Sequence, residues 1–398
     1  MYFWNFGFYG EDSWRVRKNL VATFGLRLEH LAPWQDAYNL GAAVLDPATI
    51  ADPVSSTNPL PGFTWHALNP SVPDSGTGSR ALFYEPRIGV AWDIRGNGVL
   101  VLRGGYGAYR MHDSVVDVTN AFANSGGLRE PNLFGFGGLT LGGVDSLHFP
   151  ITNGPLTTSA FGLYRGDDKE PVTNNYSVSL AQQLPKNSVL QITYAGNNSN
   201  SLMNNGSTQA VVLNNLNALS VNALYEAPPR ALPPGICANP TCTPYEVQNL
   251  TATQIQQYWR PYPEYQSITV PCHNTYANYN AMQVVWQKQS GHLNYSFNYT
   301  WSKALGILGS AANFNWTGAI DPFNIRSNYG PMNFDHTHIF NATYSYTVGK
   351  YVHDGVLGGF VNNWLFSGIT SIQSGGDMQT GISASPNFNL NGFITPSG

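Results

Sequence analysis

Two short motifs in the chain contain residue types that could support chemistry, and each also has a plain structural explanation. The segment DHTH at residues 335–338 places two imidazoles on one side of an extended strand, but no third and fourth metal ligands follow at a suitable spacing. The segment GGYG at residues 104–107 could suggest a phosphate-binding loop, yet no helix follows to offer its N-terminus to an anion. No Ser-His-Asp, Cys-His or paired-carboxylate spacing stands out either. The sequence therefore predicts no enzyme, no metal site and no cofactor.

Charged residues fall on one side of several predicted strands. The set consists of Arg27, Glu29, Glu85, Arg87, Asp93 and Arg103. These side chains could guide a polar solute or hold a plug domain. Alternatively, opposite charges on neighbouring strands pair across a water-filled interior, and we favour this second interpretation.

Aromatic residues are the other candidates for ligand contact. The tryptophans near predicted strand ends are Trp14, Trp92, Trp286, Trp301 and Trp364. They could stack on sugars, but an indole ring also suits the lipid headgroup level, so we favour an interfacial girdle. The most interaction-like loop cluster consists of Tyr258, Trp259, Arg260 and Tyr262. A packed loop core explains that cluster at least as well.

Long strands must position these residues. In residues 293–302, Leu293, Phe297 and Trp301 belong to an apolar set that alternates with a polar set containing Asn294 and Thr300. Strand side chains alternate between faces, so this pattern predicts one apolar face and one polar face. A tilted strand needs about 9–11 residues to cross a bilayer, whereas soluble strands usually have about five or six. The sequence therefore predicts strands that span an outer membrane.

The same unit, two strands joined by a short turn, recurs along the chain. The predicted strand pairs are residues 5–14 with 20–30, 84–93 with 99–110, 175–184 with 189–197, about 281–287 with 293–301, and 338–348 with 363–374. Long loops rich in Pro, Gly, Asn and Ser separate the pairs, at about residues 31–83, 111–173, 198–277 and 304–335. Alternation of short turns and long loops is typical of outer-membrane barrels. The predicted fold is all-β: an antiparallel up-and-down transmembrane β-barrel that is partial and open, with about ten strands.

Composition agrees with this prediction. Charged residues make up 11% of the 398 residues, against about 25% in an average soluble domain. The sequence contains no run of about eighteen apolar residues, so it predicts no transmembrane helix. The net charge of −4 gives no reason to expect nucleic acid binding.

Several segments resemble the barrel of TonB-dependent receptors, in particular the Oar-like subfamily. In residues 8–30 the matching residues are Asp12, Trp14, Arg15, Asn19, Gly25, Leu26, Arg27 and Glu29. The segment FYEPRIGVAWDIRGNGVLVLRGGYGAYR is similar to a second recurring hairpin, and NFDHTHIFNATYSY and NNWLFSGITSIQSG resemble two further strands. The resemblance covers most predicted strands and none of the long loops.

This resemblance implies a longer protein with a TonB box, a plug domain and a barrel of about 22 strands. The sequence shows no plug domain and no signal peptide, so we expect residues 1–398 to be an internal piece of such a barrel. The expected function is TonB-dependent uptake of an oligosaccharide, peptide or chelate across the bacterial outer membrane. Its partners would be membrane lipid, the missing plug domain, and TonB through the absent N-terminal region. The alternatives are a passive porin-like channel and a structural or adhesive surface barrel.

The cysteines support a testable prediction. Cys237 and Cys242 lie close together in one predicted loop, and Cys272 follows later in the same loop. We predict that Cys237 and Cys242 form a disulfide, because thiols in an oxidising compartment oxidise and the short spacing allows it. Mass spectrometry of non-reduced peptides from protein made through the periplasm should find the two joined. Two free thiols would contradict the prediction.

Overall fold

The structure is a computed structural model of residues 1–398. It describes residues 1–50, 52, 61–113, 118, 160–204, 216–217, 219, 225–229, 232, 243, 258–262, 265, 268–307, 324–332, 334–353 and 355–376. Within these residues, no helix is long and apolar enough to cross a membrane.

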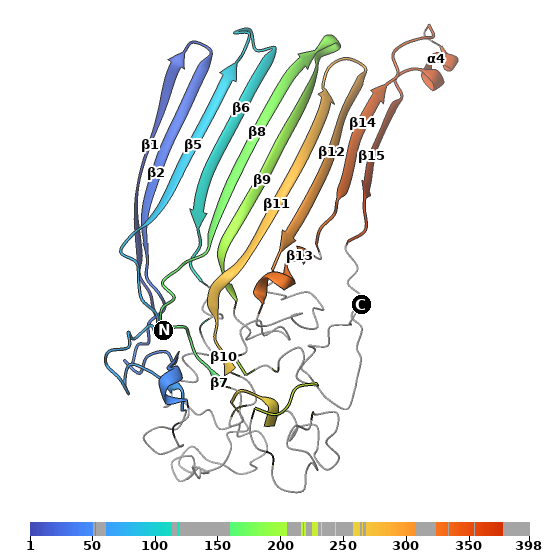
Figure 1. The fold of residues 1–398 in the computed structure, drawn as a ribbon. Helices are drawn as coiled ribbons and strands as arrows, with labels where there is room; N and C mark the ends of the chain where they lie inside the picture. Colours follow the sequence, from blue (N-terminus) through green and yellow to red (C-terminus); the bar gives the residue numbers. More distant parts are fainter. Residues whose placement is uncertain are drawn as a thin grey trace, which may run out of the picture.

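Ten long strands form one antiparallel sheet in which each strand lies beside its neighbours in the chain (Figure 1). They are β1 (Asn5–Arg17), β2 (Leu20–Leu31), β5 (Phe83–Asp93), β6 (Leu100–Arg110), β8 (Val172–Leu184), β9 (Ser188–Asn204), β11 (Cys272–Lys288), β12 (Leu293–Gly306), β14 (His338–Thr347) and β15 (Leu365–Gln373). Among the described residues, β1 pairs only with β2 and β15 only with β14. The predicted open, up-and-down sheet is therefore confirmed.

Short elements lie outside this order. The short strands are β3 (Val44–Leu45), β4 (Phe63–Thr64), β7 (Ala160–Phe161), β10 (Ile268–Thr269) and β13 (Gly330–Pro331). The helical segments are α4 (Val356–Val361) and 3-10 turns at Pro47–Thr49, Pro185–Asn187 and Ile325–Asn328. β3 pairs with β4, β7 pairs with β10, and β13 pairs with the end of β12.

The short turns lie at one end of the sheet, and the described parts of the longer connections between hairpins lie at the other (Figure 1). The turn between β5 and β6 shows why these connections are tight. Gly96 and Gly98 both have positive φ angles, 73° and 74°, which a side chain would disfavour. The Asp93 carboxylate accepts hydrogen bonds from both of their backbone N–H groups. The residues of the turn thus fix the register of the hairpin.

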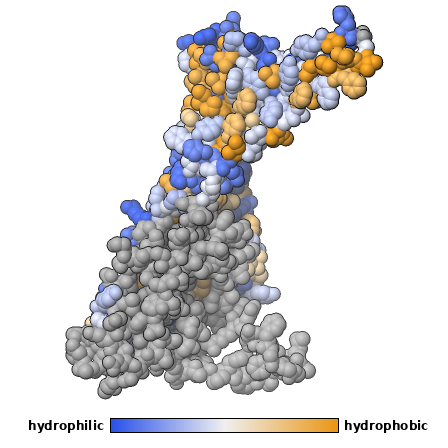
Figure 2. Space-filling model, turned by 90° about the vertical axis from the view of Figure 1, so that its right-hand side faces the viewer, coloured by the Kyte–Doolittle hydropathy of each residue, from blue (hydrophilic) through white to orange (hydrophobic). Residues whose placement is uncertain are grey.

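The apolar side chains of the central strands share one face. Met282 pairs with Trp301, and Trp286 pairs with Phe297, so these outward residues meet across the β11–β12 hairpin. Viewed from the β15 side, apolar residues form a zone between hydrophilic residues at the turn rim and hydrophilic residues nearer the loops (Figure 2). This zone is the surface that the predicted faces assign to lipid.

Alanines interrupt the exposure of this face. Ala342 belongs to the outward set but is buried, because the larger ring of Phe297 lies directly opposite it. Ala108 also has outward parity and is buried near the loop end of β6. Facing outward and being exposed are thus separate properties for a residue as small as alanine.

The strand bounds differ from the predicted ones at the loop end. β9 and β11 stay paired out to Asn204 and Cys272, so the predicted loop at residues 198–277 is shorter at both ends. Two register irregularities, between His273 and Thr275 and between Thr275 and Ala277, accompany this extension. Such bulges break strict alternation, which is why the period-two pattern did not reveal the extra pairing.

The last hairpin has bounds within two residues of the predicted ones. β14 ends at Thr347 and β15 begins at Leu365, and the connection contains α4. This helix exposes Val356, Leu357 and Phe360. The predicted long connection is therefore present, with a helical turn at its tip.

The larger buried apolar clusters lie among the loops, because the apolar face of the sheet points away from the rest of the chain. One cluster contains Ala42, Val44, Val72, Val118, Phe161 and Leu163. A second contains Phe63, Ala160, Tyr265, Ile268 and Val270. The described loop segments therefore form apolar clusters, and polar side chains can also be buried among them.

The predicted tryptophans all have substantial exposure. Trp14, Trp92, Trp286, Trp301 and Trp364 are 40–60% exposed. Trp14, Trp92 and Trp286 lie toward the turn ends of their strands, whereas Trp301 lies toward the loops. This arrangement fits the interfacial interpretation better than a sugar site, because the rings lie near both ends of the strands instead of gathering at one place.

The assignment of faces predicts different effects for two neighbouring substitutions. Phe297→Arg would place a charge toward lipid at a cost of about 2–4 kcal/mol near the bilayer midplane, whereas Asn298→Arg would stay hydrated on the polar face. We expect Phe297→Arg to reduce folding into lipid vesicles far more than Asn298→Arg. Heat-dependent gel mobility would measure the folded fraction, and equal effects would show that the faces are wrongly assigned.

Candidate functional site

Three of the predicted lumen charges form an ion-pair cluster where β2 meets β5. Arg27 lies opposite Glu85 in the strand register. Its Nε and Nη2 atoms donate to the two carboxylate oxygens of Glu29 at 3.0 and 2.6 Å. Glu85 Oε2 lies 4.0 Å from Arg27 Nε, and Glu85 is buried. The arginine therefore compensates two neighbouring carboxylates, as the pairing interpretation expects.

The other predicted lumen charges have different surroundings. The Arg87 guanidinium lies 4.8 Å from the centre of the Tyr109 ring, close enough for a cation–π contact. Asp93 differs from the prediction, because its carboxylate caps the β5–β6 turn instead of joining the lumen set. Arg103 shares the face of Arg87, and no ion pair to it is found within the described strands.

The loop residues proposed for ligand contact are partly buried. Trp259 is 6% exposed, and its Nε1 donates to the carbonyl of Glu226 at 2.8 Å. Arg260 is 8% exposed. Tyr262 packs against the cluster around Tyr265, and Tyr258 is half-buried. These positions favour the alternative of a packed loop core, so ligand contact by this segment stays a prediction.

The remaining sequence motifs also have structural roles or lie outside the description. The two imidazoles of the DHTH segment have separate partners, since His336 Nδ1 contacts the Ser374 carbonyl and His338 Nδ1 contacts the Tyr299 hydroxyl. Residues 104–107 lie inside β6. Cys237 and Cys242 lie outside the described residues, so their disulfide stays a prediction.

The sequence did not reveal a buried polar cluster where three loop segments meet, which we call the loop cluster. It consists of Asp113, Asp167, Glu170 and His273. Asp113 follows β6, Asp167 and Glu170 precede β8, and His273 is near the start of β11. Pairing of β6 with β8, together with the hydrogen bond from Met111 N to the Pro171 carbonyl, brings the first two segments together.

The His273 ring lies between two carboxylates. Its Nε2 is 2.8 Å from Asp113 Oδ2, and its Nδ1 is 3.0 Å from Asp167 Oδ2. The backbone N–H of His273 also donates to Asp167 Oδ2 at 2.6 Å. Burial works against the charged ring, but hydrogen bonds to the two aspartates outweigh it and raise the pKa of His273 to about 10.

Glu170 has a different environment from the aspartates. It is 7% exposed, and its Oε2 atom lacks a hydrogen-bond partner. Burial, together with the nearby charge of Asp113, raises the pKa of Glu170 to about 8. Arg110 donates to the backbone carbonyl of Glu170 rather than to its carboxylate.

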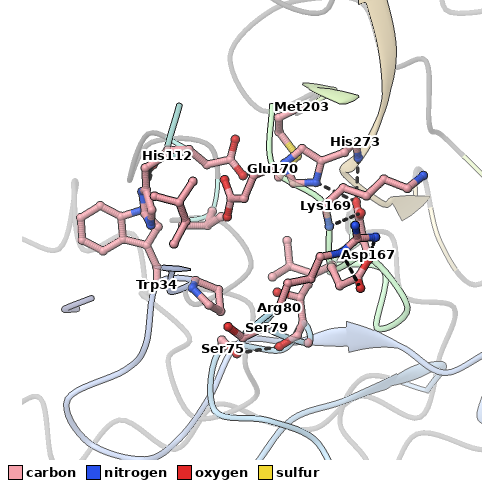
Figure 3. Close-up of a pocket in the computed structure, with 18 of the residues that line it drawn as sticks. Trp34, Ser75, Ser79, Arg80, His112, Asp167, Lys169, Glu170, Met203 and His273 are labelled. Carbon is pink, nitrogen blue, oxygen red and sulfur yellow. Dashed lines mark hydrogen bonds and ion pairs between the residues drawn. The ribbon is translucent and has the colours of Figure 1, made fainter. Parts of the chain in front are cut away.

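The loop cluster borders a small cavity of about 30 Å³ (Figure 3). In this view the Glu170 and His273 side chains approach each other on one side of the cavity, with Trp34 and Arg80 on its flanks. Arg80 holds Asp168 through two hydrogen bonds at 2.9 and 2.8 Å. A cavity of this volume can hold an ion or one or two waters, but it is too small for a siderophore or a sugar.

The loop cluster lacks a sequence signature because its members are far apart in the chain. Asp113 and His273 are 160 residues apart. No local spacing rule joins residues at that distance. The sequence contained only an indirect indication. Short turns alternate with long loops along the chain, so the strand ends on the loop side must lie near each other.

The lumen cluster leads to a paired prediction. Arg27→Met should lower the free energy of unfolding by about 1–3 kcal/mol, because it leaves Glu29 and Glu85 beside each other without the guanidinium that they share. Arg103→Met is the matched control, and we expect a change within about 0.5 kcal/mol. Urea denaturation followed by tryptophan fluorescence would measure both. Equal stability of the two variants would contradict a structural role for the Arg27 ion pairs.

Comparisons with known proteins agree with this architecture. A family model described as an outer membrane beta barrel domain matches residues 1–396. No curated protein matches the sequence.

Some solved structures share a weak likeness with the chain. The FrpB iron transporter from Neisseria meningitidis (F3-3 variant) is 8% identical with a TM-score of 0.39, and the match covers 86% of this chain and 30% of that one. The outer membrane transporter YddB from Escherichia coli is 10% identical with a TM-score of 0.38, covering 93% and 46%. The ferric-catecholate import receptor Fiu from K12 E. coli is 9% identical with a TM-score of 0.36, covering 88% and 32%.

The chain thus spans less than half the length of each of these proteins. Because the family model matches nearly all of the chain, the protein belongs to the outer membrane β-barrel domain family and resides in the bacterial outer membrane.

Proposed function

We propose that this chain is part of the barrel of a TonB-dependent uptake receptor of the Oar-like kind. The observation that carries the proposal is the sheet itself, with an apolar outer face, a polar inner face and long loops at one end. The sequence resemblance of residues 8–30 and 83–110 to hairpins of that subfamily supports it. A plug domain in a longer protein would gate the lumen, and the cell's energy-coupling machinery would act on that domain.

In this proposal the loops capture the ligand and the polar face offers it a hydrated path. The charged residues of the polar face differ in how freely they can contact a solute. The Arg27 guanidinium is already engaged by two carboxylates, whereas Arg103 has no ion partner among the described residues and can meet a passing solute. An oligosaccharide, a peptide or a chelate would fit this description, and we propose no catalytic step.

Transport measurements in the native bacterium would test the proposal. We expect deletion of the gene to abolish accumulation of one probe among a labelled ferric catecholate, an oligosaccharide and an oligopeptide. Loss of the energy-coupling protein TonB should abolish accumulation of the same probe. Complementation with Arg103→Met should lower its uptake several-fold if the probe is anionic, while Ile88→Val on the outer face should not.

Other results would point to the rival functions. Uptake that needs this gene but not TonB would indicate a passive porin. Unchanged uptake of every probe, together with loss of surface attachment, would indicate an adhesive or structural barrel. Either result would overturn the proposal.

A further inference from the structure

We propose that Asp113, Glu170 and His273 bind one divalent transition-metal cation, of which zinc(II) is the reference case. The three residues come from three different loop segments, and one ligand atom of each lies within 4.8 Å of the other two. Ligand atoms bound to one tetrahedral zinc ion at about 2.0–2.2 Å lie about 3.3–3.6 Å from each other. Side-chain movements of about one ångström would therefore bring the three ligands to a cation.

Asp167 orients the His273 ring of this site. A metal-bound histidine usually donates its other ring N–H to a carboxylate, which fixes the orientation of the ring. His273 Nδ1 contacts Asp167 Oδ2 at 3.0 Å, and the same oxygen accepts the His273 backbone N–H at 2.6 Å. The Nε2 atom is thereby directed at Asp113 Oδ2, 2.8 Å away. A cation bound here would take the place of the Nε2 proton that now lies between His273 and Asp113, so binding would release that proton.

Glu170 supplies an independent indication of a ligand. Its carboxylate lines the cavity and is almost fully buried, and its Oε2 atom has no hydrogen-bond partner. A buried polar atom without a partner is costly, and a cation in the cavity would satisfy it. The cavity volume of about 30 Å³ suits an ion with bound water and excludes an organic molecule.

The donor set narrows the class of cation. One imidazole nitrogen and two carboxylates suit zinc(II), cobalt(II) and related transition metals. Calcium prefers six to eight oxygen ligands, so an imidazole in the set disfavours it. Three protein ligands also leave a position for water. This inference is independent of the proposed uptake function, since the site would join the loops whatever passes through the lumen.

Metal binding to the isolated protein would test the site. Protein purified from outer membranes in detergent and stripped with a chelator should bind one zinc(II) by mass-spectrometric metal analysis. Cobalt(II) should bind competitively and produce visible absorption bands of a low-coordinate site. Because the chain has nine histidines, variants must locate the ion. Glu170→Gln and Asp113→Asn should each weaken binding at least tenfold, and Asp167→Asn should weaken it about 10–100-fold.

The control is His336→Gln, which removes an imidazole outside the loop cluster and should leave binding unchanged. Glu170→Gln keeps the size and shape of the side chain and should therefore still fold. Heat-dependent gel mobility would verify that it does. In the parent protein the cation should also protect the loops from protease, and Glu170→Gln should lose this protection. The proposal is wrong if the parent protein takes up no zinc(II) or cobalt(II). It is equally wrong if folded Glu170→Gln and Asp113→Asn bind as tightly as the parent protein.

Discussion

The need to satisfy every backbone hydrogen bond without water determines most of this structure. Lipid offers no partners to N–H and C=O groups, so a segment that crosses it as a strand must find them on neighbouring strands. The long strands answer this requirement in the simplest order, because each pairs with the strand before or after it in the chain. The short turns follow from the same constraint, since an antiparallel neighbour needs only a tight connection. Strand length, turn chemistry and the alternation of side chains thus all follow from the lipid that surrounds the sheet.

A second solvent determines the rest. The loops lie in water and bury their apolar residues against each other, as a soluble domain does, with Phe63 and Tyr265 in one such cluster. The same chain therefore has an apolar surface that faces outward in the sheet and apolar cores that face inward among the loops. Charges follow this division. Arg27 and Glu29 pair on the polar face of the sheet, whereas His273 and its carboxylates are enclosed by loop segments.

The sequence predicted the part of the fold that obeys a local rule. The parity of Phe297 and Asn298 and the turn at residues 95–98 could be read directly, because period-two alternation and turn residues depend only on near neighbours. The ends of β9 and β11 could not, because bulges near Thr275 interrupt that alternation. The parity of Asp93 could be read, but its role as a cap could not, because that role depends on the turn bringing the Gly96 and Gly98 N–H groups to its carboxylate. The loop cluster could not be predicted at all, because only the folded loops bring its residues together.

The separation of contacts along the chain has a consequence for the order of assembly. Strands within a hairpin meet after closing a turn of a few residues, which is fast. The loop contacts close much larger segments, since the Tyr265 hydroxyl donates to the Pro61 carbonyl across 204 residues. Loop-closure entropy therefore favours early formation of the hairpins and late formation of the loop body. The loop region around Tyr265 and His273 should therefore be the last to acquire its native packing.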